Sequence, residues 1–431
     1  MSHFLLQYAM IRDIKTHSTN FNNIVRLLKG SVFVQIFQLA ATFILTYYYS
    51  KNDFGVLSYI ISISAFFEII VGVQYNTASI VSLDKEHAKK LMLISSIMAI
   101  VITLLGTLIL VLVKYRYPTF IEQGIIFNVV LLIPLLIFSN FLFNNGLMIL
   151  KYFGLFKSIN RLRIIYVFSM FLLKLFAAIV FHTLYSLIIA HLLALLLCVV
   201  CYVVIFRKNI LPIVFTLHLK ESLDLLKSYS KFPRFSLLSN LISAAATISF
   251  PLLIKYFYGF DENGIYYLTG VFIFQPLLLI IQAISDAFLP EVKSMFHNEK
   301  NRLLKFIKKQ QKQIFIITFL YILIAIIAGE YFFKWILPQK WQEVGGFIKY
   351  IAIFYLFTNI YIPYSFVADY LGQQKYLLIF NSLLFLVQFL TLYLLHQHIS
   401  FNVMMLLISF ITSFFYLYIN FNMLGKLKKS Q

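Results

Sequence analysis

Long apolar runs, each close to the length that crosses a membrane, recur about twelve times along this 431-residue chain. A helix needs about 20 apolar residues to cross the ~30 Å hydrocarbon layer of a bilayer. Charged residues make up only 12% of the chain, against roughly 25% in soluble domains. The sequence therefore predicts an all-α polytopic membrane protein with no sizeable domain outside the bilayer.

Polar residues separate these runs and define the predicted spans. Only His182 and Thr183 lie between the fifth and sixth spans, which predicts a tight helical hairpin. The predicted spans cover residues 30–49, 55–78, 91–113, 124–147, 162–181, 184–206, 236–257, 264–288, 314–336, 345–366, 376–396 and 400–422.

Basic residues are divided unequally between the two sides of these spans. Of the 36 Lys and Arg residues, 28 fall on the side that carries both termini, six fall on the other side, and Lys174 and Lys349 lie within spans. By the positive-inside rule, both termini face the cytoplasm. Because the basic residues are not gathered on one polar domain, the net charge of +20 indicates membrane orientation, and no nucleic-acid partner is expected.

The longest polar segment between spans, residues 207–235, separates two halves of similar size. Leucines alternate there with charged residues, which fits either an amphipathic helix on the anionic inner leaflet or a solvated connector. The predicted division is a cytoplasmic segment 1–29, an N-lobe 30–206 (helices 1–6), a cytoplasmic linker 207–235, a C-lobe 236–422 (helices 7–12) and a cytoplasmic tail 423–431.

The two halves share a short motif at equivalent places. Residues 47–55 (YYYSKNDFG) join span one to span two, and residues 256–264 (YFYGFDENG) join span seven to span eight. An aromatic and acidic turn that ends in Gly and recurs in this way suggests six-plus-six parallel repeats. In transporters, such repeats build a substrate site between two lobes.

These motifs resemble a known family, the polysaccharide-exporting flippases of the multidrug/oligosaccharidyl-lipid/polysaccharide superfamily. The O-antigen (Wzx-type) translocases are the group that the chain resembles most. In topology the resemblance covers nearly the whole chain. The residues that carry it are 51–55 (KNDFG), 72–78 (GVQYNTA), 261–267 followed by Pro276, 231–233 (KFP) at the start of span seven, and Pro290 after span eight.

The resemblance implies a MATE-like fold, in which two six-helix lobes related by a pseudo-two-fold axis enclose a cavity that opens alternately to each side. It implies a transporter rather than an enzyme, in the bacterial inner membrane. The implied activity moves oligosaccharide repeat units on undecaprenyl diphosphate to the periplasmic leaflet, for O-antigen or related surface polysaccharide. Spans one, two, seven and eight line the cavity in that superfamily, which points to Gln35, Gln38, Glu68, Gln74, Asn76, Asn240, Gln275, Gln282 and Asp286.

The partners implied are this lipid-linked oligosaccharide and membrane lipids, with a polysaccharide polymerase and a chain-length regulator as candidate protein partners. No cofactor is expected, and a coupling ion would be H⁺ or Na⁺.

Two charged residues fall deep inside predicted spans. Lys174 lies about twelve residues, or roughly 18 Å of helix, from the cytoplasmic start of its span, which is too far for its side chain to reach the interface. A charge near the midplane costs at least ~2.5 to 3.5 kcal/mol, so Lys174 should face protein or water. It is a candidate for attracting the substrate diphosphate, with a buried hydrogen-bonded lysine as the alternative. Glu68 either pairs with a cation or carries a coupling proton.

Two other functions fit parts of this pattern. A cation-coupled small-molecule (multidrug) antiporter would share the fold, but that branch usually has an acidic residue in its first span, and residues 30–49 contain none. A membrane polysaccharide polymerase or ligase would need a sizeable outer catalytic loop, and every predicted outer loop is short. The sequence therefore favours the flippase.

Overall fold

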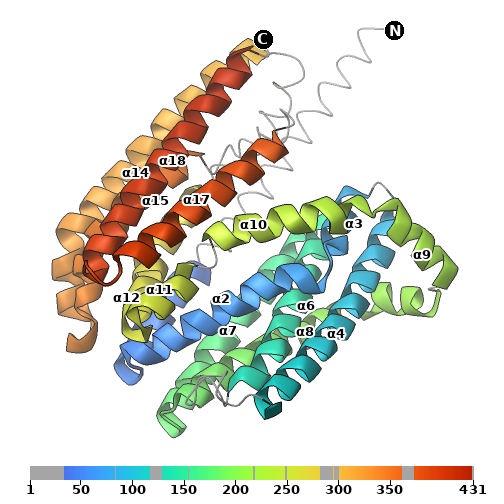
Figure 1. Cartoon of the computed structure of the whole chain (residues 1–431). Coiled ribbons are helices and arrows are strands. Elements are labelled where there is room, and N and C mark those ends of the chain that lie inside the picture. Colours follow the sequence, from blue (N-terminus) through green and yellow to red (C-terminus); the bar gives the residue numbers. More distant parts are fainter. Residues whose placement is uncertain are drawn as a thin grey trace, which may run out of the picture.

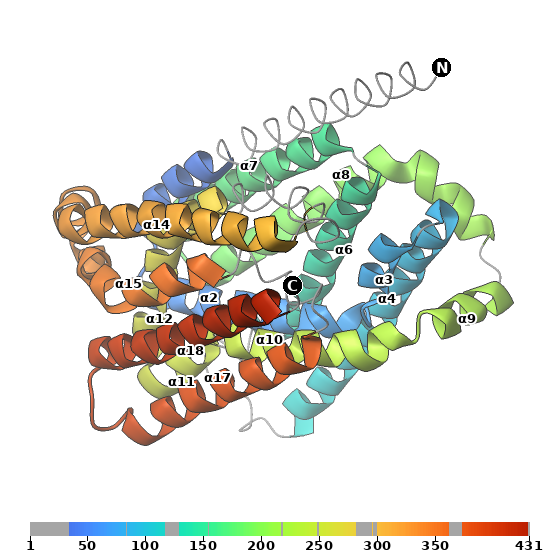
Figure 2. The ribbon, with the colours of Figure 1, turned by 90° about the horizontal axis from the view of Figure 1, so that it is seen from above.

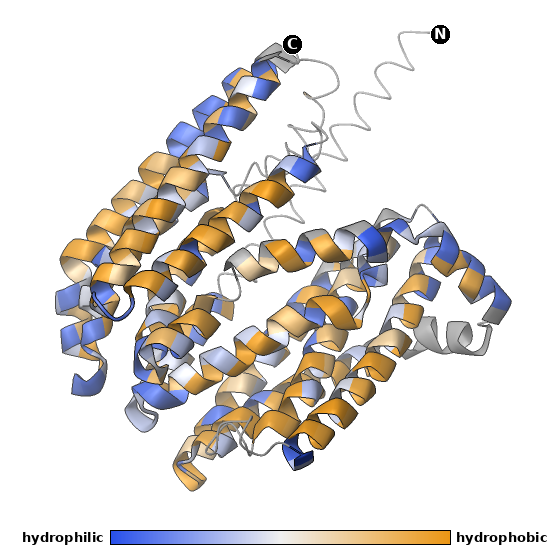
Figure 3. Cartoon of the chain, in the orientation of Figure 1, coloured by the Kyte–Doolittle hydropathy of each residue, from blue (hydrophilic) through white to orange (hydrophobic). Residues whose placement is uncertain are grey.

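The computed structural model describes residues 34–82, 84–116, 129–153, 155–216, 219–247, 250–281, 295, 300–361 and 373–429. Nearly all of these residues lie in helices (Figure 1). Ten of the described helices are long and apolar enough to cross a membrane, and the helix Val34–Tyr48 is apolar but shorter. Figure 3 shows hydrophobic residues along the middle of the helices and hydrophilic residues toward their ends. The prediction of an all-α polytopic membrane protein is confirmed.

In the N-lobe, the short helix Val34–Tyr48 is followed by Ser50, where a reciprocal cap starts the first long helix. The Ser50 side chain accepts from the backbone N–H of Asp53, and the Asp53 carboxylate accepts from the backbone N–H of Ser50. Its fifth and sixth spans form the predicted hairpin. The N-lobe helices are α2 (Lys51–Val71), α3 (Tyr75–Val81), α4 (Lys85–Arg116), α6 (Ile133–Tyr152), α7 (Phe156–Val180) and α8 (Leu184–Thr216).

The segment between the lobes contains α9 (Leu219–Ser228), followed by a π-helical turn at Phe232–Ser236. The Lys90 ammonium forms an ion pair with Glu221, and the Tyr75 hydroxyl donates to the Leu226 carbonyl at 3.2 Å. Leu225 is buried against this end of the N-lobe. The helix with one apolar side that the first interpretation predicted is therefore present, and it is attached to α3 and α4.

The seventh span consists of two helices, α10 (Leu237–Thr247) and α11 (Phe250–Tyr258). Pro251 lies in the first turn of α11, where its missing N–H removes no helical hydrogen bond. α10 packs against both α2 and α17, and α11 packs against α12, α2 and α17. In Figures 1 and 2, α10 lies between the two bundles. Both halves of this span therefore contact α2 of the N-lobe as well as helices of the C-lobe.

The C-lobe repeats the up-and-down arrangement of the N-lobe. The eighth span bends through a π-helical turn at Gly270–Phe274. α14 is 37 residues long, about 55 Å at 1.5 Å per residue, so it extends well beyond a ~30 Å hydrocarbon layer. After α11, the C-lobe helices are α12 (Phe260–Thr269), α14 (Lys300–Ile336), α15 (Glu343–Tyr361), α17 (Gln374–Leu395) and α18 (Phe401–Lys429).

The two lobes meet at one end of the molecule, which we call the closed end; it holds the residues around Ser50, Gly259 and Trp341. A Cβ on Gly264 would lie 2.1 Å from the Lys51 carbonyl oxygen, and a Cβ on Gly55 would lie 1.9 Å from the Phe260 carbonyl oxygen. Only glycine permits such an approach. The two sequence motifs that recur in the halves therefore pack against each other.

Polar side chains add to this contact. The Asn263 amide donates to the Gly55 carbonyl at 2.9 Å, and the Trp341 indole donates to the Thr46 carbonyl at 3.1 Å. The Lys51 ammonium lies 2.7 Å from a carboxylate oxygen of Glu343. These bonds join the helices 34–48 and α2 to α12 and α15.

Figure 1 shows the two bundles diverging toward the opposite end, where α18 ends; we call this the splayed end. Basic side chains gather there in both lobes. They include Lys89 and Lys90 at the start of α4, Lys157 and Arg161 at the start of α7, and Arg302, Lys305, Lys308, Lys309 and Lys312 at the start of α14.

Candidate functional site

A cavity of about 250 Å³ lies between the lobes, on the inner side of the closed end. α2 contributes Ser58 and Ser62 from the N-lobe. The C-lobe contributes Pro251, Gln275 and a group of aromatic side chains from α12, the π-helical turn and α15: Tyr266, Tyr267, Phe274 and Tyr355.

The described residues that line this inter-lobe cavity include no charged side chain. Hydroxyl groups and the Gln275 amide supply hydrogen-bond donors and acceptors, and aromatic rings supply apolar surface. The rings are held in place by one another, because Phe274 stacks on Tyr355 with centroids 3.5 Å apart. The cavity therefore suits a neutral polar ligand with apolar faces.

Of the predicted site residues, Gln275 lines this cavity. Gln74 and Asn240 lie outside it and contact each other. The Asn240 amide on α10 donates to the Gln74 side-chain oxygen at 2.9 Å. Gln74 precedes α3 in the left-handed conformation, with φ of 60°, and its amide donates to the Ile69 carbonyl at 3.2 Å. This bond holds α10 against the N-lobe near the splayed end.

Glu68 lies on α2, and its partner was not identified from the sequence. The Asn144 amide on α6 donates to a Glu68 carboxylate oxygen at 2.7 Å. No ion pair to Glu68 is found among the described residues. An amide partner leaves the charge of the carboxylate uncompensated, so the site can accept a proton or a small cation.

Lys174 is half-buried on α7, and its charge interacts with His191 on α8. The Nδ1 atom of His191 is buried and has no hydrogen-bond partner among the described residues. The structure therefore does not bring Lys174 and Glu68 into an ion pair. Lys174 belongs to a polar region inside the N-lobe that also contains Ser64 and Asn140, which lie beside His191.

The remaining predicted site residues are dispersed. Gln35 is buried, and its amide nitrogen has no hydrogen-bond partner in the part of the chain that the structure describes, whereas Gln38 is half-buried. The Asn76 amide contacts the Met148 sulfur at 3.7 Å. Gln282 and Asp286 lie outside the described residues. No group of His, Cys, Asp and Glu in the described part of the chain could hold a metal ion.

The sequence did not identify the serine and tyrosine residues of the inter-lobe cavity. Ser58 and Ser62 are four residues apart on one face of α2, but small hydroxyls at this spacing are also common in helix packing. Their role becomes visible only because Tyr266 and Tyr267 approach from the other lobe.

Comparison with known proteins gives the family. A profile of the polysaccharide biosynthesis protein family matches residues 44–345, well over half of the chain. No curated protein sequence matches the chain significantly.

Several solved structures are similar over nearly the whole length. The lipid II flippase MurJ in an inward closed conformation has a TM-score of 0.67 at 15% identity, covering 94% of this chain and 89% of that chain. A multidrug resistance MATE family transporter of the MOP superfamily, inward-facing, has a TM-score of 0.62 at 15% identity, covering 95% and 96%. Its outward-facing conformation has a TM-score of 0.57 at 14% identity, covering 94% and 96%.

These likenesses concern the fold, and they match the two-lobed arrangement that the sequence led us to expect. The fold is that of membrane transporters rather than of a membrane enzyme. The chain thus belongs to the polysaccharide biosynthesis protein family and has the fold of the MATE transporters and of the flippase MurJ.

Proposed function

We propose that this protein is a flippase that moves oligosaccharide units linked to undecaprenyl diphosphate from the cytoplasmic to the periplasmic leaflet of the bacterial inner membrane. The observation that carries the proposal is that the described residues lining the inter-lobe cavity are uncharged. A sugar presents hydroxyl groups and apolar ring faces, which hydroxyl, amide and aromatic side chains bind. A cationic drug would instead require acidic groups. Membership of a polysaccharide biosynthesis family supports the same substrate class.

The distribution of charge supports an orientation. Basic residues of both lobes gather at the splayed end, and the positive-inside rule places that end in the cytoplasm. Both termini then face the cytoplasm, and the closed end seals the periplasmic side. A headgroup would enter between the lobes from the cytoplasm and stop at the inter-lobe cavity.

Transport then requires the closed end to open. The bonds that join the lobes there include those of Asn263, Trp341 and Lys51, together with a hydrogen bond from the Tyr47 hydroxyl to the Ile336 carbonyl at 2.9 Å. Alternating access by rocking lobes requires these bonds to break. Near the splayed end, the Gln74–Asn240 hydrogen bond joins α10 to the N-lobe. Oligosaccharide released outside would pass to a polysaccharide polymerase and its chain-length regulator.

Two N-lobe residues are assigned roles in this cycle. Glu68, which has only an amide partner among the described residues, is the proposed site for a coupling H⁺ or Na⁺. Lys174 supplies positive potential that favours the diphosphate group of the substrate. If polymer export continued at the normal rate with Lys174→Ala and with Lys174→Glu, this role for Lys174 would be excluded.

Deletion of the protein tests the proposed function. Lipid-linked oligosaccharide should accumulate in the cytoplasmic leaflet of the deletion strain, and the purified protein in liposomes should restore its movement. Loss of resistance to cationic drugs without accumulation would indicate an antiporter instead. Joining of oligosaccharides by the purified protein would indicate a polymerase or ligase.

A further inference from the structure

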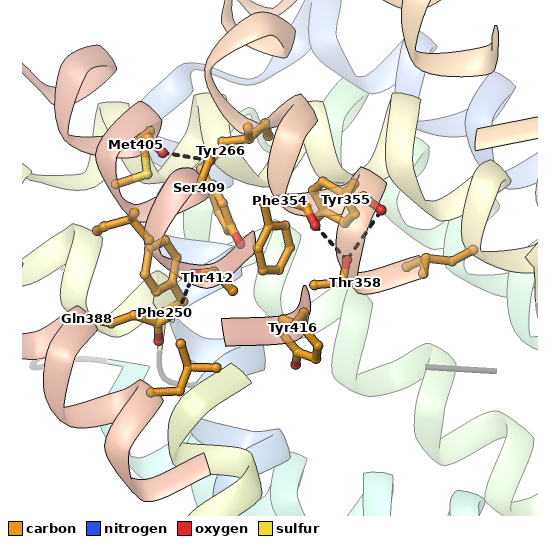
Figure 4. A pocket seen from close by; sticks show the side chains of 14 residues that line it. Phe250, Tyr266, Phe354, Tyr355, Thr358, Gln388, Met405, Ser409, Thr412 and Tyr416 are labelled. Atoms are coloured by element: carbon orange, nitrogen blue, oxygen red, sulfur yellow. Dashed lines mark hydrogen bonds between the residues drawn. The ribbon is translucent and has the colours of Figure 1, made fainter. Parts of the chain in front are cut away.

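A second cavity, of about 220 Å³, lies inside the C-lobe rather than between the lobes. Its lining comes from α11, α12, α15, α17 and α18, together with Leu278 from the eighth span. Figure 4 shows Phe354, Thr412 and Tyr416 arranged around this space, with Gln388 beside it. We call it the C-lobe pocket.

Hydrogen-bonding groups occupy one side of the C-lobe pocket. The Gln388 amide nitrogen donates to the Thr412 hydroxyl at 2.9 Å, and both residues are buried, with 3% and 0% of their surfaces exposed. This bond leaves the Gln388 side-chain oxygen as an acceptor and the Thr412 hydroxyl proton as a donor. The Ser409 hydroxyl donates to the Tyr350 carbonyl at 2.7 Å, so its lone pairs remain available as acceptors.

Aromatic rings form the other walls, and their positions are fixed by neighbouring rings. Phe354 packs edge-on against Tyr355, with centroids 4.7 Å apart. Tyr416 is held between Tyr361 at 5.7 Å and Phe380 at 6.0 Å. Such contacts favour a single arrangement, so the pocket is formed before a ligand arrives.

The C-lobe pocket adjoins the inter-lobe cavity. Tyr266, Leu278 and Tyr355 line both spaces, so these three side chains form the wall that the two spaces share. A group bound in the C-lobe pocket could therefore be part of a ligand whose remainder occupies the space between the lobes.

We propose that the C-lobe pocket binds a single sugar ring of the lipid-linked oligosaccharide; the proposal rests on the proposed function. The volume lies below the ~300–1,000 Å³ of pockets for drug-sized ligands, which fits one ring rather than an oligosaccharide. The described lining carries no charge, so a diphosphate or a cationic drug has no counter-charge there. An isoprenoid tail would leave the buried Gln388–Thr412 pair without a new partner, whereas ring hydroxyls would satisfy it.

Binding of two lipids by the purified full-length chain in lipid nanodiscs tests the proposal. One probe is lipid-linked oligosaccharide extracted from cells that lack the protein, and the other is undecaprenyl diphosphate without sugar. The variants are Gln388→Leu and Thr412→Val. The control is Thr391→Val, which removes a hydroxyl one turn from Gln388 on the same helix, where it donates to the Val387 carbonyl at 2.7 Å.

The wild-type protein should bind the glycosylated lipid more tightly than undecaprenyl diphosphate. Gln388→Leu or Thr412→Val should weaken binding of the glycosylated lipid about tenfold, because each leaves a sugar hydroxyl unpaired in a buried site. Binding of undecaprenyl diphosphate should not change, which also shows that the variants fold. Thr391→Val should bind both lipids as the wild type does.

The outcomes separate the two proposals. If the wild-type protein prefers the glycosylated lipid and the pocket variants keep that preference in full, the C-lobe pocket is not a sugar site, while the proposed function stands. If the wild-type protein binds neither lipid, the proposed function fails, and the inference fails with it.

Discussion

The interiors of the two lobes differ in both charge and space. The N-lobe holds Glu68 and Lys174 at depth, and the hollow beside His191 leaves no space for a water-sized molecule. The C-lobe has a pocket of about 220 Å³ whose described lining is uncharged. The N-lobe therefore has charged residues in its interior and a tightly packed hollow beside His191, whereas the C-lobe pocket combines neutral polar groups with open space.

This difference teaches how one fold can divide two tasks. A charge inside a membrane is strongly affected by a nearby ion or proton, because the surrounding dielectric constant is low. A neutral pocket with fixed hydrogen-bonding groups instead recognises the shape and hydroxyls of a ligand. We therefore expect changes in the N-lobe to affect the energetics of transport and changes in the C-lobe to affect selectivity.

The largest effect is expected from a substitution that separates the two lobes at the closed end. Gly264→Val would place a side chain against the Lys51 carbonyl, where even a Cβ would lie at 2.1 Å. We expect closure of this end to be destabilised by about 3 kcal/mol, and transport to fall about 100-fold. The measurement is the rate of lipid movement in liposomes. Gly106→Val is the matched control, because no atom lies within 4 Å of its added Cβ; equal rates for the two variants would contradict the expectation.

Introducing a larger side chain into each lobe compares how tightly the two interiors are packed. Ser64 in the N-lobe and Ser409 in the C-lobe are both buried, with 1% and 2% of their surfaces exposed. Ser64→Leu should lower the free energy of unfolding by about 1–3 kcal/mol more than Ser409→Leu, because the C-lobe pocket beside Ser409 has room for the larger side chain and the hollow beside Ser64 does not. Thermal unfolding in detergent measures the difference, and equal losses would show that the C-lobe pocket is not open space.

Neutralising Glu68 tests whether the charge inside the N-lobe couples transport to an ion gradient. Glu68→Gln keeps a hydrogen bond to Asn144 possible but removes the carboxylate. We expect transport driven by an H⁺ or Na⁺ gradient to fall about tenfold, equivalent to ~1.4 kcal/mol. Gln388→Leu should leave the response to the gradient intact. Gradient-driven transport that is unaffected by Glu68→Gln would remove the coupling role.

The smallest effect is expected at the ion pair between the lobes. Lys51 and Glu343 are 2.7 Å apart, but the Glu343 side chain is largely exposed. Exposed pairs of this kind contribute about 0.2–1 kcal/mol. A double-mutant cycle with Lys51→Met and Glu343→Gln, followed by thermal unfolding, should give a coupling energy in that range. A coupling energy several times larger would mean that this pair, rather than the glycine contact, holds the closed end together.

The sequence predicted the helices well because hydrophobic length alone identifies a membrane span. It also identified the repeated turns 47–55 and 256–264, although not that Gly55 and Gly264 allow them to touch. Pairings between distant residues could not be predicted, since Glu68 and Asn144 are 76 positions apart. The C-lobe pocket was missed because glutamine, threonine and tyrosine are unremarkable singly and become a site only where five helices converge.

The buried indole at the closed end gives the protein an intrinsic fluorescence reporter. The sequence contains two tryptophans; Trp341 is fully buried against Phe54, and Trp335 is 84% exposed. Replacing Trp335 with phenylalanine would leave a single emitter in an apolar environment. When the lobes part, water should reach that indole and its emission should move to longer wavelengths, so the opening step could be followed in real time without an attached dye.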